Sequence, residues 1–219
     1  MSSPHANQPV RTAGLPLGAL PTPRAQAAML MAHGRGATAE SILTLSQAWN
    51  VPGFAYLAPQ AAGNSWWPNR FLDPIESNEP YLSSALAAVE SALATLKRAG
   101  IPPERTLLLG FSQGACLALE FAARHARRYG GVAALSGGLV GPDGTPRDYA
   151  GSLDGTPVFL GCSDADFHIP KARVEHSADV LRRLDAVVTM RLYPNMEHTV
   201  NEDELAFVEG LMKDVLRTI

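Results

Sequence analysis

The sequence lacks the features that mark several large classes of protein. It has only two cysteines, Cys116 and Cys162, with no C-x-x-C pair and no metal-ligand spacing. Neither a disulfide scaffold nor a zinc site is therefore expected, and both cysteines are predicted to be free, buried thiols. Lysine and arginine (18) do not outnumber aspartate and glutamate (21), and the formal net charge of −3 gives no basic surface for nucleic acid. No apolar run approaches the roughly 20 residues that span a bilayer, so no stable membrane anchor is expected.

A secretory signal is also missing from the first residues. The stretch MSSPHANQPVRTAG has neither a basic start nor an apolar core, and together with the free cysteines this predicts a cytoplasmic protein. The composition, 46% hydrophobic and 18% charged, is that of an ordinary globular protein, and 219 residues fit one domain with a sizeable core. We expect a loop-rich segment over 1–26, with a short edge hairpin as one option, and a single domain over 27–219.

Short apolar runs alternate with helical patterns along that domain. Strands are predicted over 27–32, 54–58, 106–109, 132–135, 158–161 and 187–192, and helices over 38–49, 81–99, 113–128, 171–184 and 201–216. This alternation predicts a three-layer α/β fold, with a mostly parallel central sheet and helices on both faces. The irregular segment 60–80 interrupts the pattern, and connections of this length usually carry function or form a lid.

The stretch GFSQG places Ser112 between a predicted strand and a predicted helix. This is the context of a nucleophile elbow, a sharp turn that exposes a reactive serine and tolerates only small neighbours. Gly110 and Gly114 supply those neighbours, and Ser112 is therefore the predicted nucleophile. A serine hydroxyl needs a base within hydrogen-bond reach, and the base needs a carboxylate to orient it.

Two other strand ends supply those groups, because ligands of such sheets meet the loops at the carboxyl ends of the strands. DADFHIP offers Asp164 and Asp166, and MEHT offers His198. The chain order serine, acid, histidine is that of an α/β-hydrolase triad. At a third strand end, HGRG lets backbone N–H groups approach a ligand, so the N–H groups of Arg35 and Gln113 are the predicted oxyanion hole.

Taken together, HGRGA, APQ, GFSQGA, DADFHIP and MEHT resemble the phospholipase/carboxylesterase family of small α/β-hydrolases, relatives of acyl-protein thioesterases. The resemblance runs in order from Met29 to the C-terminus. It implies an esterase with a Ser112–Asp166–His198 triad that needs no cofactor and no metal. Two positions depart from the family pattern: Arg35 stands where an apolar residue is usual, and Asn195 replaces a glycine before His198.

Several residues keep a second interpretation. Asp164 competes with Asp166 as the acid but also suits a loop-capping role, while His168 is expected at the rim and His33 beneath the oxyanion loop. The Arg35 side chain either binds an anionic substrate group or pairs with Glu40, the commoner outcome. Substrate-binding candidates are Trp66, Trp67, Leu72, Phe111 and Phe167. We expect one of the two tryptophans in the pocket and the other in the core, with Trp66 slightly favoured for the pocket.

The function predicted from the sequence is a serine carboxylesterase that cleaves small or short-to-medium acyl esters through an acyl-enzyme. An acyl-thioesterase, lysophospholipase or peptidase on the same scaffold is an alternative, as is a catalytically inactive binding protein. The expected partner is a small-molecule ester. Small members of such families often dimerise, so a homodimer is one further expectation.

Overall fold

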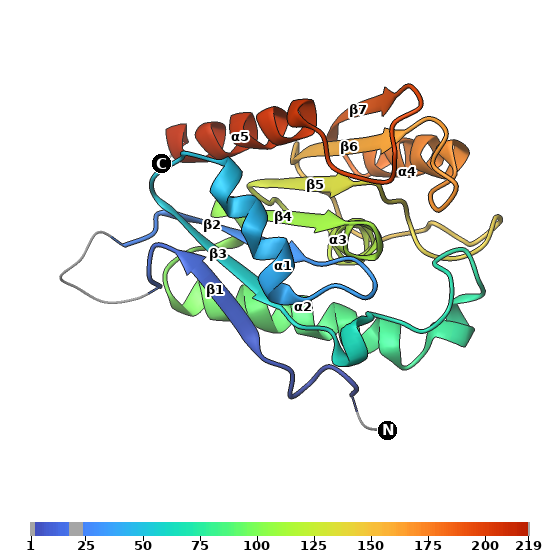
Figure 1. The fold of residues 1–219 in the computed structure, drawn as a ribbon, viewed down its shortest axis with the longest axis horizontal. Coiled ribbons are helices and arrows are strands. Elements are labelled where there is room, and N and C mark those ends of the chain that lie inside the picture. The colour runs from blue at the N-terminus through green and yellow to red at the C-terminus, as the bar shows by residue number, and fades with distance from the viewer. Residues whose placement is uncertain (1–2, 18–23, 219) are drawn as a thin grey trace.

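The chain folds around one seven-stranded sheet (Figure 1). The computed structural model describes residues 3–17 and 24–218. The strands are β1 (Val10–Gly14), β2 (Ala27–Ala32), β3 (Phe54–Pro59), β4 (Thr106–Phe111), β5 (Gly131–Leu135), β6 (Pro157–Ser163) and β7 (Val187–Tyr193). Their order across the sheet is β1-β3-β2-β4-β5-β6-β7, and β1 alone runs antiparallel to its neighbour. The carboxyl ends of β2 to β7 therefore meet at one edge of the sheet.

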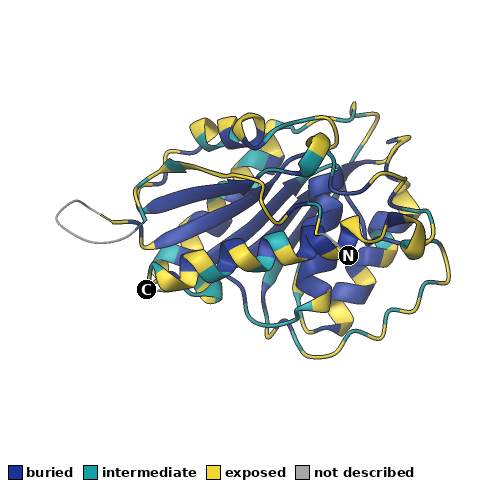
Figure 2. Cartoon of the chain, turned by 90° about the horizontal axis from the view of Figure 1, so that it is seen from below, coloured by how far each residue is buried: buried dark blue, intermediate teal, exposed yellow. Residues whose placement is uncertain are grey.

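Helices cover both faces of this sheet, as the sequence predicts. One hydrophobic core joins the sheet to α2 (Tyr81–Arg98), α3 (Gln113–Arg124) and α4 (Lys171–Arg183). A second core, on the opposite face, joins it to α1 (Ala39–Leu43) and α5 (Glu202–Arg217). Figure 2 shows the strands buried between helices whose outer faces are exposed. The three-layer α/β prediction is confirmed.

Two predicted helices end earlier than expected. The helix predicted over 38–49 is α-helical only to Leu43 and continues as a 3₁₀ helix, η1 (Thr44–Ala48). There the hydroxyls of Thr44 and Ser46 donate to the carbonyls of Ser41 and Leu43, which competes with regular helix formation. The helix predicted over 113–128 ends at Arg124, because Ala126 forms an isolated β-bridge with Gly151.

The N-terminal segment contributes an edge strand, β1, but this strand does not form a hairpin with a second strand among the described residues of the same segment. β1 pairs with β3, from Val10 opposite Pro59 to Gly14 opposite Ala55. Its partner thus comes from the main domain and not from the segment 1–26. Residues 18–23 of that segment lie outside the described residues.

Candidate active site

Ser112 occupies the joint between β4 and α3 in a strained backbone conformation. Its φ of 54° and ψ of −120° are rarely adopted by a residue with a side chain. A Cβ on Gly110 would overlap the Gly114 carbonyl, and one on Gly114 would overlap the Ala32 carbonyl. The glycines thus let the start of α3 pack against β4 and against the end of β2. The strain at Ser112 matches the elbow that the sequence predicts.

A line of hydrogen bonds runs from Ser112 through His198 to Asp166. Ser112 Oγ lies 2.9 Å from His198 Nε2, and His198 Nδ1 lies 2.6 Å from Asp166 Oδ2. Because a carboxylate only accepts, Nδ1 carries the proton and Nε2 is left to accept from the serine hydroxyl. The sequence placed these residues at three different strand ends, and the sheet brings them together.

The Asp166 carboxylate is held in its charged form. Its burial would raise the pKa, but hydrogen bonds from His198 and from the backbone N–H groups of His168 and Ile169 outweigh that cost and lower it. Asp164 has the loop-capping role that was its alternative: its Oδ1 accepts from the Asn195 N–H at 2.9 Å. Asn195 has a φ of 51°, the left-handed conformation that the replaced glycine would favour and that asparagine tolerates.

Arg35 and Gln113 both belong to the surroundings of Ser112: Gln113 follows it in the chain, and Arg35 follows Gly34, where an added Cβ would lie 3.4 Å from Ser112 Cβ. Both residues line the cavity that contains Ser112 Oγ and His198. In the described part of the chain neither backbone N–H donates to another group, and that of Gln113 belongs to the first residue of α3, where an N–H has no partner within the helix. The prediction that these two N–H groups bind an oxyanion therefore stays a prediction that their unpaired state allows.

The side chains of the same two residues hold one loop. The Gln113 carboxamide accepts from the Trp66 N–H and donates to the Trp67 carbonyl, each at 2.9 Å. The Arg35 guanidinium donates to the carbonyls of Pro68 and Asn69 at 2.7 and 2.5 Å. Arg35 therefore does not pair with Glu40, which forms an ion pair with Arg11 at 2.6 Å instead. The expectation of an Arg35–Glu40 pair was wrong.

Two buried histidines fasten the start of this loop. His33 accepts from the Ala61 N–H through Nε2 and faces the Gly34 carbonyl with Nδ1. His5 accepts from the Ala62 N–H through Nδ1 and faces the Trp66 carbonyl with Nε2. Burial lowers the pKa of both, consistent with neutral rings that accept on one nitrogen and donate on the other. His33 was expected to have a structural role. The role of His5 was not predicted, because no motif surrounds this histidine in its proline-rich segment.

The cavity above Ser112 has a volume of about 690 Å³, within the range of small-molecule sites. Phe111 and Trp67 line it as predicted. Both tryptophans are fully buried, but Trp66 is not among the lining residues. It packs on His33 and donates its indole N–H to the His33 carbonyl, so the preference for Trp66 over Trp67 was wrong.

The remaining substrate-binding candidates also lie elsewhere. Leu72 faces a separate hollow beside Arg147 and Arg173. Phe167 is 81% exposed and is not among the residues that line the cavity. Its ring lies 4.3 Å from that of His168, which does line the cavity, at an interplanar angle of 43°. The sequence showed which loops meet here but not which way each side chain turns. Cys116 is also among the lining residues, and burial raises the pKa of its thiol to about 12, which disfavours the thiolate, the nucleophilic form of cysteine.

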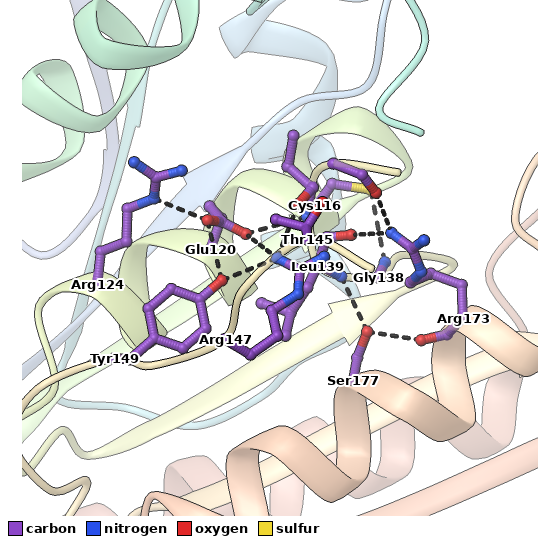
Figure 3. A network of polar contacts seen from close by, with 12 residues as sticks. Cys116, Glu120, Arg124, Gly138, Leu139, Thr145, Arg147, Tyr149, Arg173 and Ser177 are labelled. Carbon is purple, nitrogen blue, oxygen red and sulfur yellow. Dashed lines mark hydrogen bonds and ion pairs between the residues drawn. The ribbon is translucent and has the colours of Figure 1, made fainter. Parts of the chain in front are cut away.

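A buried polar network anchors the segment that follows β5 (Figure 3). Glu120 of α3 accepts from Arg124, Tyr149 and the Val140 N–H. From α4, Arg173 donates to the carbonyls of Leu139 and Gly141. The Gly141 N–H in turn donates to the carbonyl of Phe71, a cavity-lining residue, at 2.7 Å. The far wall of the cavity is thus tied to α3 and α4.

The described residues hold no cluster of three or more side chains suited to a metal ion. Among their helices, none combines the length and the apolar character needed to cross a membrane.

Comparison with known proteins identifies the family. The family model described as phospholipase/carboxylesterase matches residues 19–216. The chain belongs to this family. A phospholipase/carboxylesterase from Dyadobacter fermentans, solved by crystallography, is 40% identical with a TM-score of 0.88, covering 94% of this chain and 97% of that one.

Curated relatives of the phospholipase/carboxylesterase chain carry two kinds of name. A probable carboxylesterase from Oryza sativa subsp. japonica is 25% identical over 93% of this chain and 85% of its own length. Acyl-protein thioesterase 1 from Gibberella zeae is 33% identical, but the match spans 53% of this chain and only 51% of that protein. The family and fold expected from the sequence are confirmed, and the chain is a hydrolase of the carboxylesterase type.

Proposed function

We propose that the chain is a serine carboxylesterase that works through an acyl-enzyme formed on Ser112. The observation that carries this proposal is the line from Ser112 Oγ to His198 Nε2, 2.9 Å, and from His198 Nδ1 to Asp166, 2.6 Å, beside an open cavity. This is the arrangement in which a serine oxygen becomes a nucleophile, because the base and the group that orients it are both in contact.

In the first half-reaction Ser112 Oγ attacks the ester carbonyl carbon while its proton passes to His198 Nε2. The carbonyl oxygen becomes an oxyanion, and the N–H groups of Arg35 and Gln113 donate to it. When the tetrahedral intermediate collapses, the bond to the alcohol oxygen breaks and His198 returns the proton to that oxygen. Asp166 stays ionised and stabilises the imidazolium between these two steps.

In the second half-reaction water takes the place of the alcohol. His198 Nε2 removes a proton from the water as it attacks the acyl carbon, and the proton then passes to Ser112 Oγ as the acid leaves. Every proton taken is returned, so the residues named suffice for one turnover.

The test is a Ser112→Ala variant assayed with 4-nitrophenyl esters of increasing acyl length. We expect kcat/KM to fall by about 10⁴- to 10⁶-fold, because the nucleophile is lost while cavity and fold remain. A fluorophosphonate probe should label the wild type and not the variant. Ser136→Ala is the matched control, because Ser136 also follows a strand with a positive φ of 56°, and it should keep labelling. An unlabelled wild type would support the inactive binding protein instead.

A thioesterase is the second candidate, supported by the relatives named acyl-protein thioesterase. The same triad would attack a thioester carbonyl, so the candidates differ in substrate and not in mechanism. Oxygen esters and thioesters of one acyl group should be compared by kcat/KM. A preference of more than about tenfold for the thioester, or about 1.4 kcal/mol, would replace carboxylesterase by thioesterase.

A further inference from the structure

Two arginines line the wall of the Ser112 cavity, Arg35 and Arg70. Most guanidinium groups on a protein surface find a carboxylate or lie in open solvent. In residues 3–17 and 24–218 neither Arg35 nor Arg70 forms an ion pair, although both border the same cavity as the reactive serine. Two positive charges without a carboxylate partner beside a cavity suggest a ligand that carries a negative charge.

Arg35 is fixed in position but not neutralised. Of its five N–H bonds, one on each terminal nitrogen is used to reach the carbonyls of Pro68 and Asn69. Carbonyl oxygens orient a guanidinium without cancelling its charge, and three donors remain. The partial burial of the group lowers the pKa of Arg35, as expected for a cation that has lost water without gaining a counter-ion.

Asp73 is the single carboxylate among the lining residues, and it offsets one of the two positive charges. Asp73 accepts the backbone N–H of Arg70 at 2.9 Å and closes a local turn there. The residues that line the cavity thus include two arginines and one aspartate. A cleft with an excess of one sign raises the local concentration of ligands of the opposite sign.

We propose that the preferred substrates are esters that carry a carboxylate, with Arg35 and Arg70 as the residues that bind it. This rests on the proposed esterase function and names its substrate class. The carboxylate can belong to the acyl part, as in the half-ester of a dicarboxylic acid, or to the alcohol part, as in an acylated hydroxy acid. Either source presents the same anion to the two arginines.

A purely structural role for Arg35 makes a different prediction. If the guanidinium only holds the loop at Pro68 and Asn69, its loss should slow neutral and anionic esters by the same factor. If the guanidinium binds the substrate anion, its removal should lower kcat/KM for the anionic ester more than for the neutral one. The ratio of kcat/KM for a charged and an uncharged ester of matched size separates the two roles within one enzyme preparation.

The experiment uses the full chain at about pH 7.5, where a free carboxylate is ionised. The acyl arm compares mono-4-nitrophenyl glutarate with its methyl ester, and the alcohol arm compares 4-acetoxybenzoate with its methyl ester. In one arm we expect the wild type to favour the anion about fivefold or more, and added salt to reduce the preference. Arg35→Met should lower the ratio about five- to tenfold, and Arg70→Met about two- to fivefold, because both side chains are partly solvated.

Two further variants separate charge from loop anchoring. Arg35→Lys keeps the charge and loses the planar fork, so it should keep the ratio within about twofold. Arg98→Met removes an exposed arginine at the end of α2, which leads to the opposite end of β4 from Ser112, and should leave the ratio unchanged.

The outcomes separate a failure of the proposed preference for anionic esters from a failure of the proposed esterase function. Ester hydrolysis with no preference for the anion in either arm, or with a preference that survives Arg35→Met and Arg70→Met, would overturn the charge-based specificity and leave the esterase in place. No hydrolysis of any of the four esters, and no fluorophosphonate labelling, would overturn both.

Discussion

At the scale of single residues, the partners of a side chain decide its role more than its place in a motif. Asp164 and Asp166 lie on one loop, yet only Asp166 reaches His198, while Asp164 accepts from the Asn195 N–H. Asp166 also accepts two backbone N–H groups through its other oxygen. It is therefore ionised and fixed, as an orienting carboxylate must be.

The two aspartates should respond differently to replacement by asparagine. Asp166→Asn should lower kcat by about 10³- to 10⁴-fold, because an amide can present a donor to Nδ1 and so select the wrong histidine tautomer. Asp164→Asn should cost less than about tenfold, since the turn at Asn195 keeps an acceptor of the same shape. Steady-state kinetics on one ester measures both, and a larger loss in Asp164→Asn would refute the assignment of the acid.

At the scale of elements, the loop over 61–69 and the start of α3 behave as one unit. Gln113 lines the cavity at the start of α3, and its side chain forms hydrogen bonds with the backbone of Trp66 and Trp67. Arg35, in the loop after β2, also lines the cavity and donates to the carbonyls of Pro68 and Asn69. The cavity wall is thus held by two residues that line it together with Ser112, so a shift of the wall is expected to disturb the proposed catalytic geometry as well.

Gln113→Met should loosen that loop without removing the backbone donor. The side chain keeps its length but leaves the buried Trp66 N–H unpaired, at a cost of about 1–3 kcal/mol for such a group. The Trp67 carbonyl loses one of its two donors and keeps the hydroxyl of Ser65. We expect faster hydrogen exchange in peptides covering 61–69, and a higher KM. Peptides from α5 provide the internal control and should exchange as in the wild type. Unchanged protection over 61–69 would show that the clamp is dispensable.

At the scale of the whole molecule, one buried carboxylate makes stability depend on pH. Glu204 of α5 is fully buried; one oxygen accepts the Asn201 N–H in a capping box, and the other has no partner among the described residues. Burial raises its pKa from 4.5 to about 7. Because the folded-state pKa lies above the unfolded one, stability is full below pH 4.5 and is lost as pH rises through about 7.

Glu204→Gln removes this titration and keeps an oxygen for the capping box. The wild type should lose on the order of 2–3 kcal/mol relative to the variant between pH 4.5 and about 7. Urea unfolding of both proteins at about pH 5 and 8 measures the difference, and subtracting one from the other cancels the groups they share. A difference that does not change with pH would contradict the raised pKa of Glu204.

The local sequence pattern alone was enough to predict the layers of the fold and the positions of Ser112 and His198. Alternating apolar runs and helical faces predict the layers, because strand and helix periodicity reflect burial of each element by itself. Ser112 could be placed on its turn because the glycines at 110 and 114 are needed for close packing that no larger residue permits. His198 follows from its position at a strand end, since parallel strands bring their carboxyl ends together.

Only the tertiary structure decided which side chains meet. Trp66 and Trp67 are neighbours of the same type in the chain, and both are fully buried. Only Trp67 is among the residues that line the cavity, whereas Trp66 packs against His33. Arg35 does not pair with Glu40, because β1 places Arg11 next to that glutamate and the two form an ion pair. His5 closes the loop from 57 residues away in the sequence. Such contacts join segments that share no local signal, and their geometry is set by how the layers pack.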